Sequence, residues 1–179
     1  SRGLGDVYKR QSPYAEKVSS YLVEAYMNTR SYDAALKSID RIAKPSAQIL
    51  EAKQKILFQL GTQSFANADF EQALKYLNQS IAIGQYNRQT KADAYYWCGE
   101  SYYRLNRMVE AARDFNAYLQ LTTQPNNEMY ALANYNLGYI AFHRKDYTQA
   151  SNYFQKYIQL EKGENTTALA DAYNRIGDC

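Results

Sequence analysis

Very little in this sequence suggests catalysis or metal binding. Its 179 residues include one histidine, His143, and two cysteines, Cys98 and Cys179. One histidine cannot supply the imidazoles of a typical zinc site, and it does not assemble a convincing serine triad. Two cysteines cannot form the disulfide framework of a small secreted domain. We therefore expect no enzyme activity, no metal and no cofactor.

Clusters of like charge and long apolar runs are also missing. The chain has 21 basic and 18 acidic residues, and the basic residues are scattered along it. A nucleic-acid-binding protein usually gathers Lys and Arg on one face, so we expect no nucleic-acid partner. No apolar run approaches the roughly 20 residues that a membrane-spanning helix needs. Hydrophobic residues still make up 46% of the chain, which excludes a disordered one.

Proline is scarce, whereas tyrosine is abundant. The chain has three prolines and 19 tyrosines. Few prolines permit long helices, and tyrosine combines an apolar ring with a hydroxyl group that can hydrogen-bond. This combination favours a helical protein with aromatic side chains at packing or binding surfaces.

A pattern centred on one small residue recurs along the chain. Gly61, Gly99, Gly138 and Gly177 follow one another at 38, 39 and 39 residues, and Val23 takes the same place 38 residues before Gly61. Twelve residues after this position each complete unit has an alanine: Ala35, Ala73, Ala111 and Ala150. Bulky side chains stand three residues before and four residues after every alanine. This regularity predicts a repeated structural unit.

Each unit contains two helical patterns separated by a short polar break. The breaks read "TRSYDAA", "NADFEQA", "LNRMVEA" and "RKDYTQA". Asp and Asn suit turns and helix starts because their side chains accept backbone N–H bonds. The two patterns therefore predict an antiparallel helical hairpin, in which Gly and Ala allow the two backbones to approach.

This pattern resembles the tetratricopeptide repeat family over about residues 16–179. The motif residues in two successive units are Tyr95, Gly99, Tyr102, Ala111 and Phe115, then Leu137, Gly138, Tyr147, Ala150 and Phe154. The resemblance implies an all-α, right-handed superhelical solenoid of antiparallel helix pairs. It also implies a scaffold for protein or peptide partners rather than an enzyme.

Two departures from the family pattern concern length and side-chain size. The period is 38–39 residues, against about 34 in the family. Larger or polar residues replace a small residue late in the second helix of each unit: Ile42, Ser80, Tyr118 and Tyr157. Longer units of this kind are similar to those of bacterial cell-envelope proteins. That likeness implies the periplasm or cell envelope as one location, although the sequence leaves the compartment open.

The repeat register divides the chain into an array from residue 14 to 179. We expect units at about 16–53, 54–91, 92–130 and 131–169, then a truncated fifth unit at 170–179, with nine helices in all. Residues 1–13 do not fit the register, so we expect a linker, a damaged end or an expression remnant. Because the fifth unit lacks its second helix, we expect a fragment of a longer array. Its unpaired helix also offers a surface for self-association.

A second line of side chains runs along each first helix. Tyr95, Cys98, Gly99 and Tyr102 share one helix face and are expected in the core. A stripe rotated away from that face contains Phe58, Thr62 and Phe65 in one unit, Tyr96, Glu100 and Tyr103 in the next, and Tyr135, Tyr139 and Phe142 in the third. The family resemblance places first helices on a concave surface where partners bind. We therefore expect these nine residues and Arg104 to form a peptide-binding face.

Two other interpretations of this aromatic stripe remain open. The rings can simply pack between neighbouring first helices, which would make the segment a structural spacer. Alternatively, exposed Tyr and Trp faces can stack on sugar rings of a cell-envelope glycan. The clamp that some family members use for a C-terminal carboxylate is not expected, because the corresponding positions hold Ser20, Glu24, Gln59, Asp93 and Trp97. Exposure of the rings distinguishes a binding face from a spacer.

Overall fold

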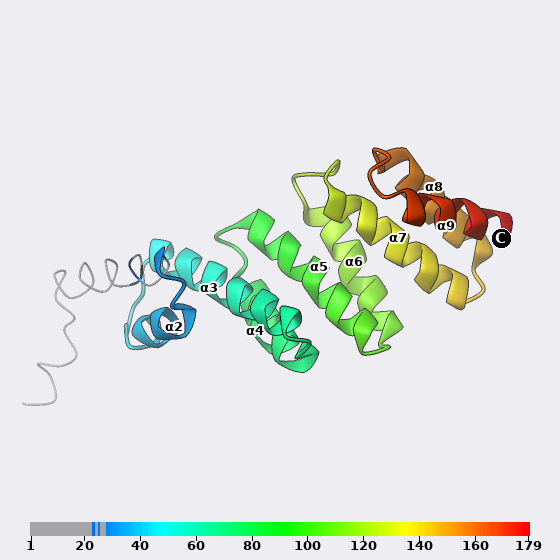
Figure 1. Ribbon diagram of the computed structural model, residues 1–179. Coiled ribbons are helices and arrows are strands. Elements are labelled where there is room, and N and C mark those ends of the chain that lie inside the picture. The colour runs from blue at the N-terminus through cyan, green and yellow to red at the C-terminus, as the bar shows by residue number, and fades with distance from the viewer. Residues whose placement is uncertain (1–22, 24, 26–27) are drawn as a thin grey trace, which may run out of the picture. The chain divides into compact units, whose positions relative to one another are not determined.

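The computed structural model describes Val23, Ala25 and residues 28–179 (Figure 1). Within these residues the chain forms eight α-helices and no β-strand. The helices are α2 (Tyr32–Asp40), α3 (Ala47–Ala66), α4 (Phe70–Ile83), α5 (Arg88–Arg104), α6 (Met108–Leu121), α7 (Glu128–His143), α8 (Tyr147–Leu160) and α9 (Thr166–Gly177). The all-α prediction is thus confirmed. None of the described helices has the length and apolar character needed to cross a membrane.

Some predictions for the start of the chain lie outside the described residues. These are the interpretation of residues 1–13 and the first helix of the first unit, of which only Val23, Ala25 and Asn28 are described, each of them helical. The remaining eight of the nine expected helices correspond to α2–α9.

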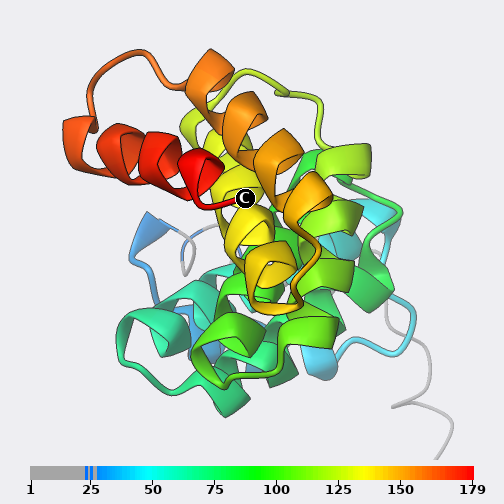
Figure 2. The same cartoon turned by 90° about the vertical axis from the view of Figure 1, so that its right-hand side faces the viewer.

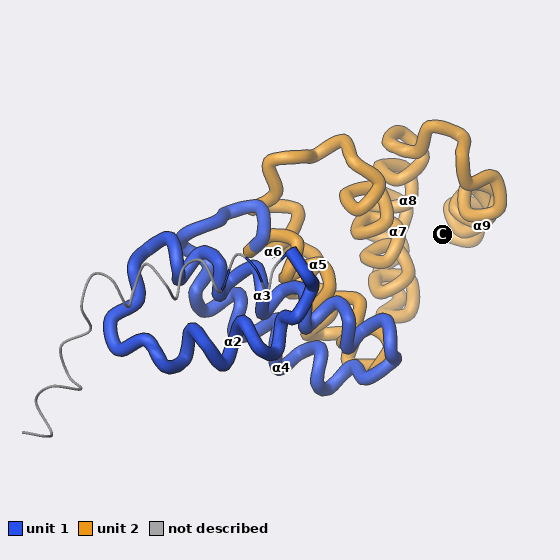
Figure 3. The backbone as a smooth tube through the Cα atoms, turned by 60° about the vertical axis from the view of Figure 1, so that its left-hand side comes forward, with its two compact units in different colours: residues 1–90 blue, residues 91–179 orange. Residues whose placement is uncertain are grey.

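The chain divides into two compact units, residues 1–90 and residues 91–179 (Figure 3). The first unit contains α2, α3 and α4, and the second contains nearly all of α5 together with α6–α9. In the first unit α3 contacts both α2 and α4, and in the second unit α7 and α9 both contact α8. Figure 2 shows α9 beside the α7–α8 pair. Helices consecutive in sequence are therefore neighbours in space within each unit.

Glycine allows close approach within three helix pairs. The nearest atoms to an added Cβ are Leu77 Cγ at 2.6 Å for Gly61, Phe115 Cδ1 at 2.8 Å for Gly99 and Phe154 Cε1 at 2.8 Å for Gly138. A glycine costs a helix roughly 1 kcal/mol relative to alanine. Close packing on a large side chain sixteen residues later offsets that cost. Gly177 differs, because a Cβ there would meet nothing within 4 Å.

The two helices of a pair are joined by the same tight turn. Ala68, Asn106 and Lys145 have φ angles of 58°, 57° and 63°, the left-handed region. In the first of these turns Ala68 N donates to Phe65 O at 2.9 Å and Asp69 N donates to Ser64 O at 2.9 Å. These bonds satisfy carbonyl groups at the end of α3 in the manner of a Schellman motif. The polar breaks in the sequence therefore correspond to helix-ending turns.

The links between successive pairs end in side chains that cap the next helix. Ser46, Asn87, Asn127 and Asn165 each accept a hydrogen bond from the backbone N–H three residues later, at 3.3, 2.9, 2.9 and 3.1 Å. Each capped helix begins before the repeat limit expected from the sequence: Ala47 against 54, Arg88 against 92, Glu128 against 131 and Thr166 against 170. The repeat register follows core residues, whereas the capping side chains mark where each helix begins.

Candidate functional site

The stripe on α7 packs against α8, the helix that follows it in the chain. Tyr135, Tyr139 and Phe142 are all half-buried. The ring centroid of Tyr135 lies 4.9 Å from that of Tyr157, and the centroid of Tyr139 lies 5.3 Å from that of Phe154. Both partners belong to α8. One side of the stripe therefore belongs to the α7–α8 core.

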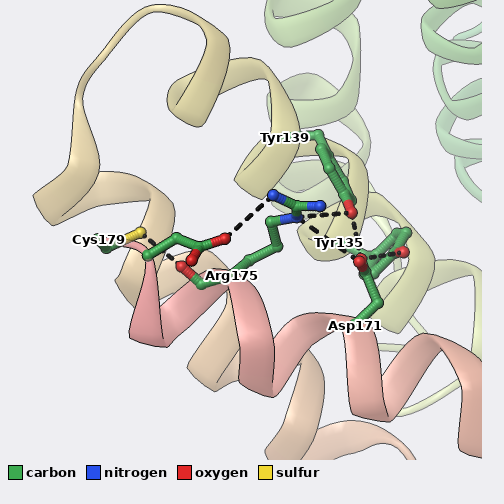
Figure 4. Close-up of polar contacts among 6 residues, drawn as sticks. Tyr135, Tyr139, Asp171, Arg175 and Cys179 are labelled. Atoms are coloured by element: carbon green, nitrogen blue, oxygen red, sulfur yellow. Dashed lines mark hydrogen bonds and ion pairs between the residues drawn. The ribbon is translucent and has the colours of Figure 1, made fainter.

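Helix α9 supplies polar partners to the same stripe (Figure 4). The Tyr135 hydroxyl donates to Asp171 Oδ2 at 2.8 Å, and the Tyr139 hydroxyl donates to the same oxygen. Arg175 Nε donates to the Tyr139 hydroxyl at 3.3 Å. The Arg175 guanidinium also lies 5.8 Å from the Tyr139 ring centroid and 5.6 Å from that of Phe142. Asp171 and Arg175 of α9 thus bind the hydroxyl groups of Tyr135 and Tyr139, and Arg175 also covers part of the Tyr139 and Phe142 rings.

The charged groups of this cluster are one cation, Arg175, and two carboxylates, Asp171 and Asp178. Burial acts to raise the pKa of Asp171, but hydrogen bonds from Tyr139 and Tyr135 and the Arg175 charge lower that pKa below its usual value. The pKa of Tyr135 is raised, first by burial and then by its bond to Asp171. Arg175 lies 3.6 Å from Asp171 Oδ1 and 3.1 Å from Asp178 Oδ2. Asp171 is therefore a charged, well-satisfied carboxylate at neutral pH.

The stripe on α5 is not as expected, because its first residue is part of the core. Tyr96 is only 4% exposed. Its ring centroid lies 5.7 Å from that of Phe115 and 5.3 Å from that of Tyr118, both on α6. Tyr95, which we expected in the core, is half-buried, while Cys98, Gly99 and Tyr102 are buried as expected. Two faces of α5 are covered, so Tyr96 offers almost no ring surface to a partner.

The other two residues of the α5 stripe have different environments. Glu100 Oε1 accepts hydrogen bonds from the Tyr96 hydroxyl at 3.1 Å and from Asn136 Nδ2 of α7 at 2.6 Å. Tyr103 is half-buried and Arg104 is exposed. Burial first, and then Tyr139 and Glu100, raise the pKa of Tyr103, whereas the Arg104 charge opposes the rise. Tyr103 therefore lies within electrostatic range of the α7 stripe.

The stripe on α3, in the first unit, is also half-buried. Phe58, Thr62 and Phe65 all fall in this range. The Thr62 hydroxyl donates to Gln59 O at 3.0 Å. The Phe65 ring packs edge-on against Phe70 at a centroid distance of 5.3 Å, across the turn to α4. The first unit thus has a half-buried stripe at the same repeat positions.

Sequence reasoning missed Asp171, Arg175 and Asn136. Each contacts a residue 36 positions away in the neighbouring first helix: Tyr135 with Asp171, Tyr139 with Arg175, and Glu100 with Asn136. This separation is about three residues shorter than the repeat period, which corresponds to nearly one helical turn. A search for hydrogen-bonding partners in neighbouring first helices, at a sequence separation one helical turn shorter than the repeat period, would have found them.

Cys98 and Asp114 are two buried residues with titratable side chains in the α5–α6 core. Cys98 is 0% exposed, and burial raises the pKa of its thiol, as expected of a packing residue. Asp114 Oδ1 accepts from Arg113 Nε at 2.7 Å, while Oδ2 has no hydrogen-bond partner in the described residues. Burial raises the Asp114 pKa and the Arg113 bond opposes it. Over the described ranges no three His, Cys, Asp or Glu residues are grouped as metal ligands.

Comparison with known proteins agrees with this architecture. Two sequence profiles described as tetratricopeptide repeat match residues 58–128 and residues 131–163, which together make up more than half of the chain. A comparison with curated protein sequences gives no match.

Several solved structures share the fold. The MamA protein is 18% identical, with a TM-score of 0.59 over 90% of this chain and 82% of that chain. BtubC from P. vanneervenii is 13% identical, with a TM-score of 0.61 over 92% of this chain and 71% of that chain. YrrB, described as a TPR protein with an unusual peptide-binding site, is 15% identical, with a TM-score of 0.60 over 89% and 73%. Profile matches, paired helices and shared fold together lead to one conclusion: the chain belongs to the tetratricopeptide repeat family.

Proposed function

We propose that this protein is a non-enzymatic scaffold that binds a peptide or protein segment along the first helices of its repeats. Within residues 91–179 the binding residues are Tyr103, Tyr139 and Phe142. The observation that carries the proposal is their partial exposure: all three stay half-buried after packing within the unit. Membership of a family of interaction scaffolds supports it, as does the peptide-binding site named for the structural neighbour YrrB.

The remaining ring surface is sufficient for a modest affinity. Complete burial of an aromatic side chain contributes about 1.5–3 kcal/mol, so the open half of each ring contributes roughly 1 kcal/mol. A micromolar complex needs about 8 kcal/mol after association costs. The three rings alone therefore fall short. We expect backbone hydrogen bonds and polar contacts from the helices to supply the rest.

A double replacement tests this function. Peptides that bind the whole chain are first selected from a displayed library, and their affinities are then measured for Tyr103→Ser/Phe142→Ser. We expect a loss of about tenfold or more, with the melting temperature lowered by only a few degrees. The matched control is Val109→Ser/Tyr173→Ser, which removes side chains that are 65% and 61% exposed. If this control weakens binding as much as the first variant, the proposed surface is wrong.

A structural spacer is the second candidate, because two stripe tyrosines are used for packing. Tyr96 is almost fully buried, and Tyr135 contacts Tyr157 and Asp171. If residues 91–179 serve only as a spacer, Tyr103→Ser/Phe142→Ser should lower the melting temperature by about 10 °C or more. Selection from the library would then yield no peptide whose binding depends on these two rings.

A further inference from the structure

The α5–α6 pair buries a carboxylate at a repeat position where other pairs have a tyrosine. Asp114 takes the place that Tyr76 has 38 residues earlier in α4 and that Tyr153 has 39 residues later in α8. Both tyrosines are half-buried, whereas the Asp114 side chain is only 1% exposed. The carboxyl group of Asp114 is therefore almost completely removed from water, which is costly for a charged side chain.

Only one of the two carboxyl oxygens of Asp114 has a partner on the protein. Oδ1 accepts a hydrogen bond from Arg113 Nε at 2.7 Å, whereas Oδ2 accepts none from the residues that the structure describes. The donor is mostly in solvent, because the Arg113 side chain is 62% exposed. A buried ion pair is stabilising only where further hydrogen bonds satisfy the remaining lone pairs. The single bond from Arg113 therefore leaves the burial of Asp114 incompletely offset.

The other titratable groups near Asp114 do not stabilise its charge. Glu110 lies one helical turn earlier on α6 and has a charge of the same sign. On α5 the Cys98 thiol is 0% exposed and close enough for the Asp114 charge to raise its pKa. Tyr102 of α5 faces Arg113, whose guanidinium lies 5.8 Å from the ring centroid. Within the described part of the chain, Arg113 is thus the one group that favours the ionised form of Asp114.

We propose that Asp114 makes the α5–α6 pair a pH-sensitive element, which opens more readily at neutral pH than in mild acid. Protonation removes the buried charge and with it the need for a second hydrogen-bond donor. This inference is independent of the proposed binding function and needs no ligand.

The direction of the pH response follows from the burial of Asp114. Burial raises the pKa of Asp114 above its usual value, and the Arg113 bond only opposes this rise. The cost of the charge is therefore complete above the folded-state pKa, and it disappears as the pH falls toward the unfolded value of about 3.9. Asp171 should respond in the opposite direction, because its pKa is lowered. Mild acid should thus tighten α5–α6 without tightening the contact of α9 with α7.

Amide hydrogen exchange of the whole chain measures the opening of this pair. Protection of the α6 amides is compared at about pH 7.5 and about pH 4.5, after correction for the chemical exchange rate, so that it reports the opening equilibrium. We expect at least about threefold greater protection at the lower pH, because a pKa shift of one unit changes such an equilibrium about tenfold. Equal or lower protection in acid, as expected if water satisfies Oδ2, would overturn the inference.

Asp114→Asn isolates the carboxylate. The amide keeps the size of the side chain and an acceptor for Arg113 Nε, but it has no charge. The variant keeps every other ionisable group, including His143. Its α6 amides should be protected at the higher pH about as well as those of the wild type at the lower pH, with no further increase in acid. An increase that persists in Asp114→Asn would contradict the assignment to this residue.

Two further variants test the neighbouring charges. Arg113→Gln should move the increase in protection to higher pH, because it removes the charge that favours ionised Asp114; a move to lower pH would contradict the inference. Glu110→Gln is the matched control on the same helix. Glu110 is paired with Arg107 and has a lowered pKa, so its replacement should preserve the increase. Loss of the increase in Glu110→Gln would place the sensitive group at the surface, and the inference would be wrong.

Discussion

The helix pairs α3–α4 and α7–α8 fill the same core position in opposite ways. In α3–α4 the first helix contributes the large Gln54 and the second helix contributes the small Ser80. In α7–α8 the first helix contributes the small Ala131 and the second contributes the large Tyr157. All four side chains are buried. A repeat can therefore keep its backbone while the large side chain changes helix.

The two arrangements also connect the core to the following loop through different polar groups. The Gln54 amide donates to Asn87 O at 2.8 Å and accepts from Asn87 N at 3.0 Å. The Tyr157 hydroxyl donates to Glu161 Oε2 at 3.2 Å. Burial, followed by Glu161, raises the pKa of Tyr157 to about 12. One pair thus uses a neutral amide, and the other uses a phenol bonded to a carboxylate.

Removing the large side chain of α7–α8 should have the largest effect. Tyr157→Ser gives α8 the serine that α4 has at the equivalent position, Ser80. In α7–α8, however, the first helix has no large side chain like Gln54 to fill the space. Tyr157 is 0% exposed and lies against Tyr135, so the substitution leaves a cavity that should cost about 3–5 kcal/mol. Urea denaturation, followed through a spectroscopic signal from the second unit, measures this loss in the free energy of unfolding. A loss below about 1 kcal/mol would mean that α7–α8 repacks freely, and the comparison would have little meaning.

The amide of α3–α4 should be next in importance. Gln54→Leu keeps a large side chain at the position but leaves the Asn87 N–H and C=O groups without their partner. An unsatisfied buried polar group costs about 1–3 kcal/mol. Both Asn87 groups are only partly buried, so we expect about 1–2 kcal/mol for each and about 2–4 kcal/mol in total. The measurement is the free energy of unfolding. Gln54→Glu is the control, because its carboxyl has no donor when ionised but regains an O–H donor beside its acceptor at low pH, so it should cost less than Gln54→Leu at low pH.

The two helix pairs can also be compared at the glycine of the first helix, Gly61 in α3 and Gly138 in α7. Gly138→Leu places its side chain against the Phe154 ring, where even a Cβ would lie 2.8 Å from Cε1, and should destabilise the protein by roughly 1–3 kcal/mol. Gly61→Leu should cost a similar amount, because a Cβ there would lie 2.6 Å from Leu77 Cγ and 3.3 Å from the Leu77 backbone N. Gly177→Leu is the control, since its Cβ meets nothing, and it should leave the melting temperature almost unchanged. Equal costs at all three glycines would mean that helix propensity, rather than close packing, decides the residue.

These contacts explain how much of the fold the sequence predicts. The small residue and the large residue sixteen positions later are fixed by the approach of two helices, so the repeat register identifies Gly138 and Phe154 directly. The starts of the helices are set separately, because Ser46 and Asn127 accept the backbone N–H groups that begin α3 and α7 several residues before the first residues of the repeat signature. The spacing of apolar side chains in the sequence identifies the core residues, whereas the capping side chains determine where each helix begins.

The candidate site was predicted less well than the fold. Tyr96 and Tyr135 occupy the same position of the repeat, yet Tyr96 is 4% exposed and Tyr135 is half-buried. Helical spacing gives the direction of a side chain but not which neighbouring helix covers it. Asp171 is a further example, because its role depends on the offset between α7 and α9. The sequence therefore predicts a stripe of residues, while the neighbouring helices decide how much of it stays open.

The pH response should also separate the neutral Gln54 connection from a charged connection in the second unit, the bonds of Tyr135 and Tyr139 to Asp171. The folded-state pKa of Asp171 lies below its usual value, so its contribution to stability is complete above the unfolded pKa of about 3.9 and is lost as the pH falls through the folded pKa. Asp171→Asn should cost about 1 kcal/mol at neutral pH and close to nothing at about pH 2. Melting temperatures of both proteins across this range provide the measurement. For Gln54→Leu the cost should stay constant over the same range, and a parallel pH dependence would contradict the contrast between the two connections.

The turns should respond alike, with the smallest effect. Ala68 in α3–α4 and Lys145 in α7–α8 both adopt positive φ angles, 58° and 63°. The left-handed region costs a residue with a Cβ about 1 kcal/mol, whereas glycine adopts it freely but loses more entropy on folding. Ala68→Gly and Lys145→Gly should therefore each stabilise the protein by about 0.5 kcal/mol, while Asn106→Gly should change little because asparagine tolerates this conformation. Thermal denaturation of the three single variants measures these differences. A gain at Ala68 without one at Lys145 would show that the pairs differ in their turns as well as in their cores, because the same backbone geometry would then carry different strain.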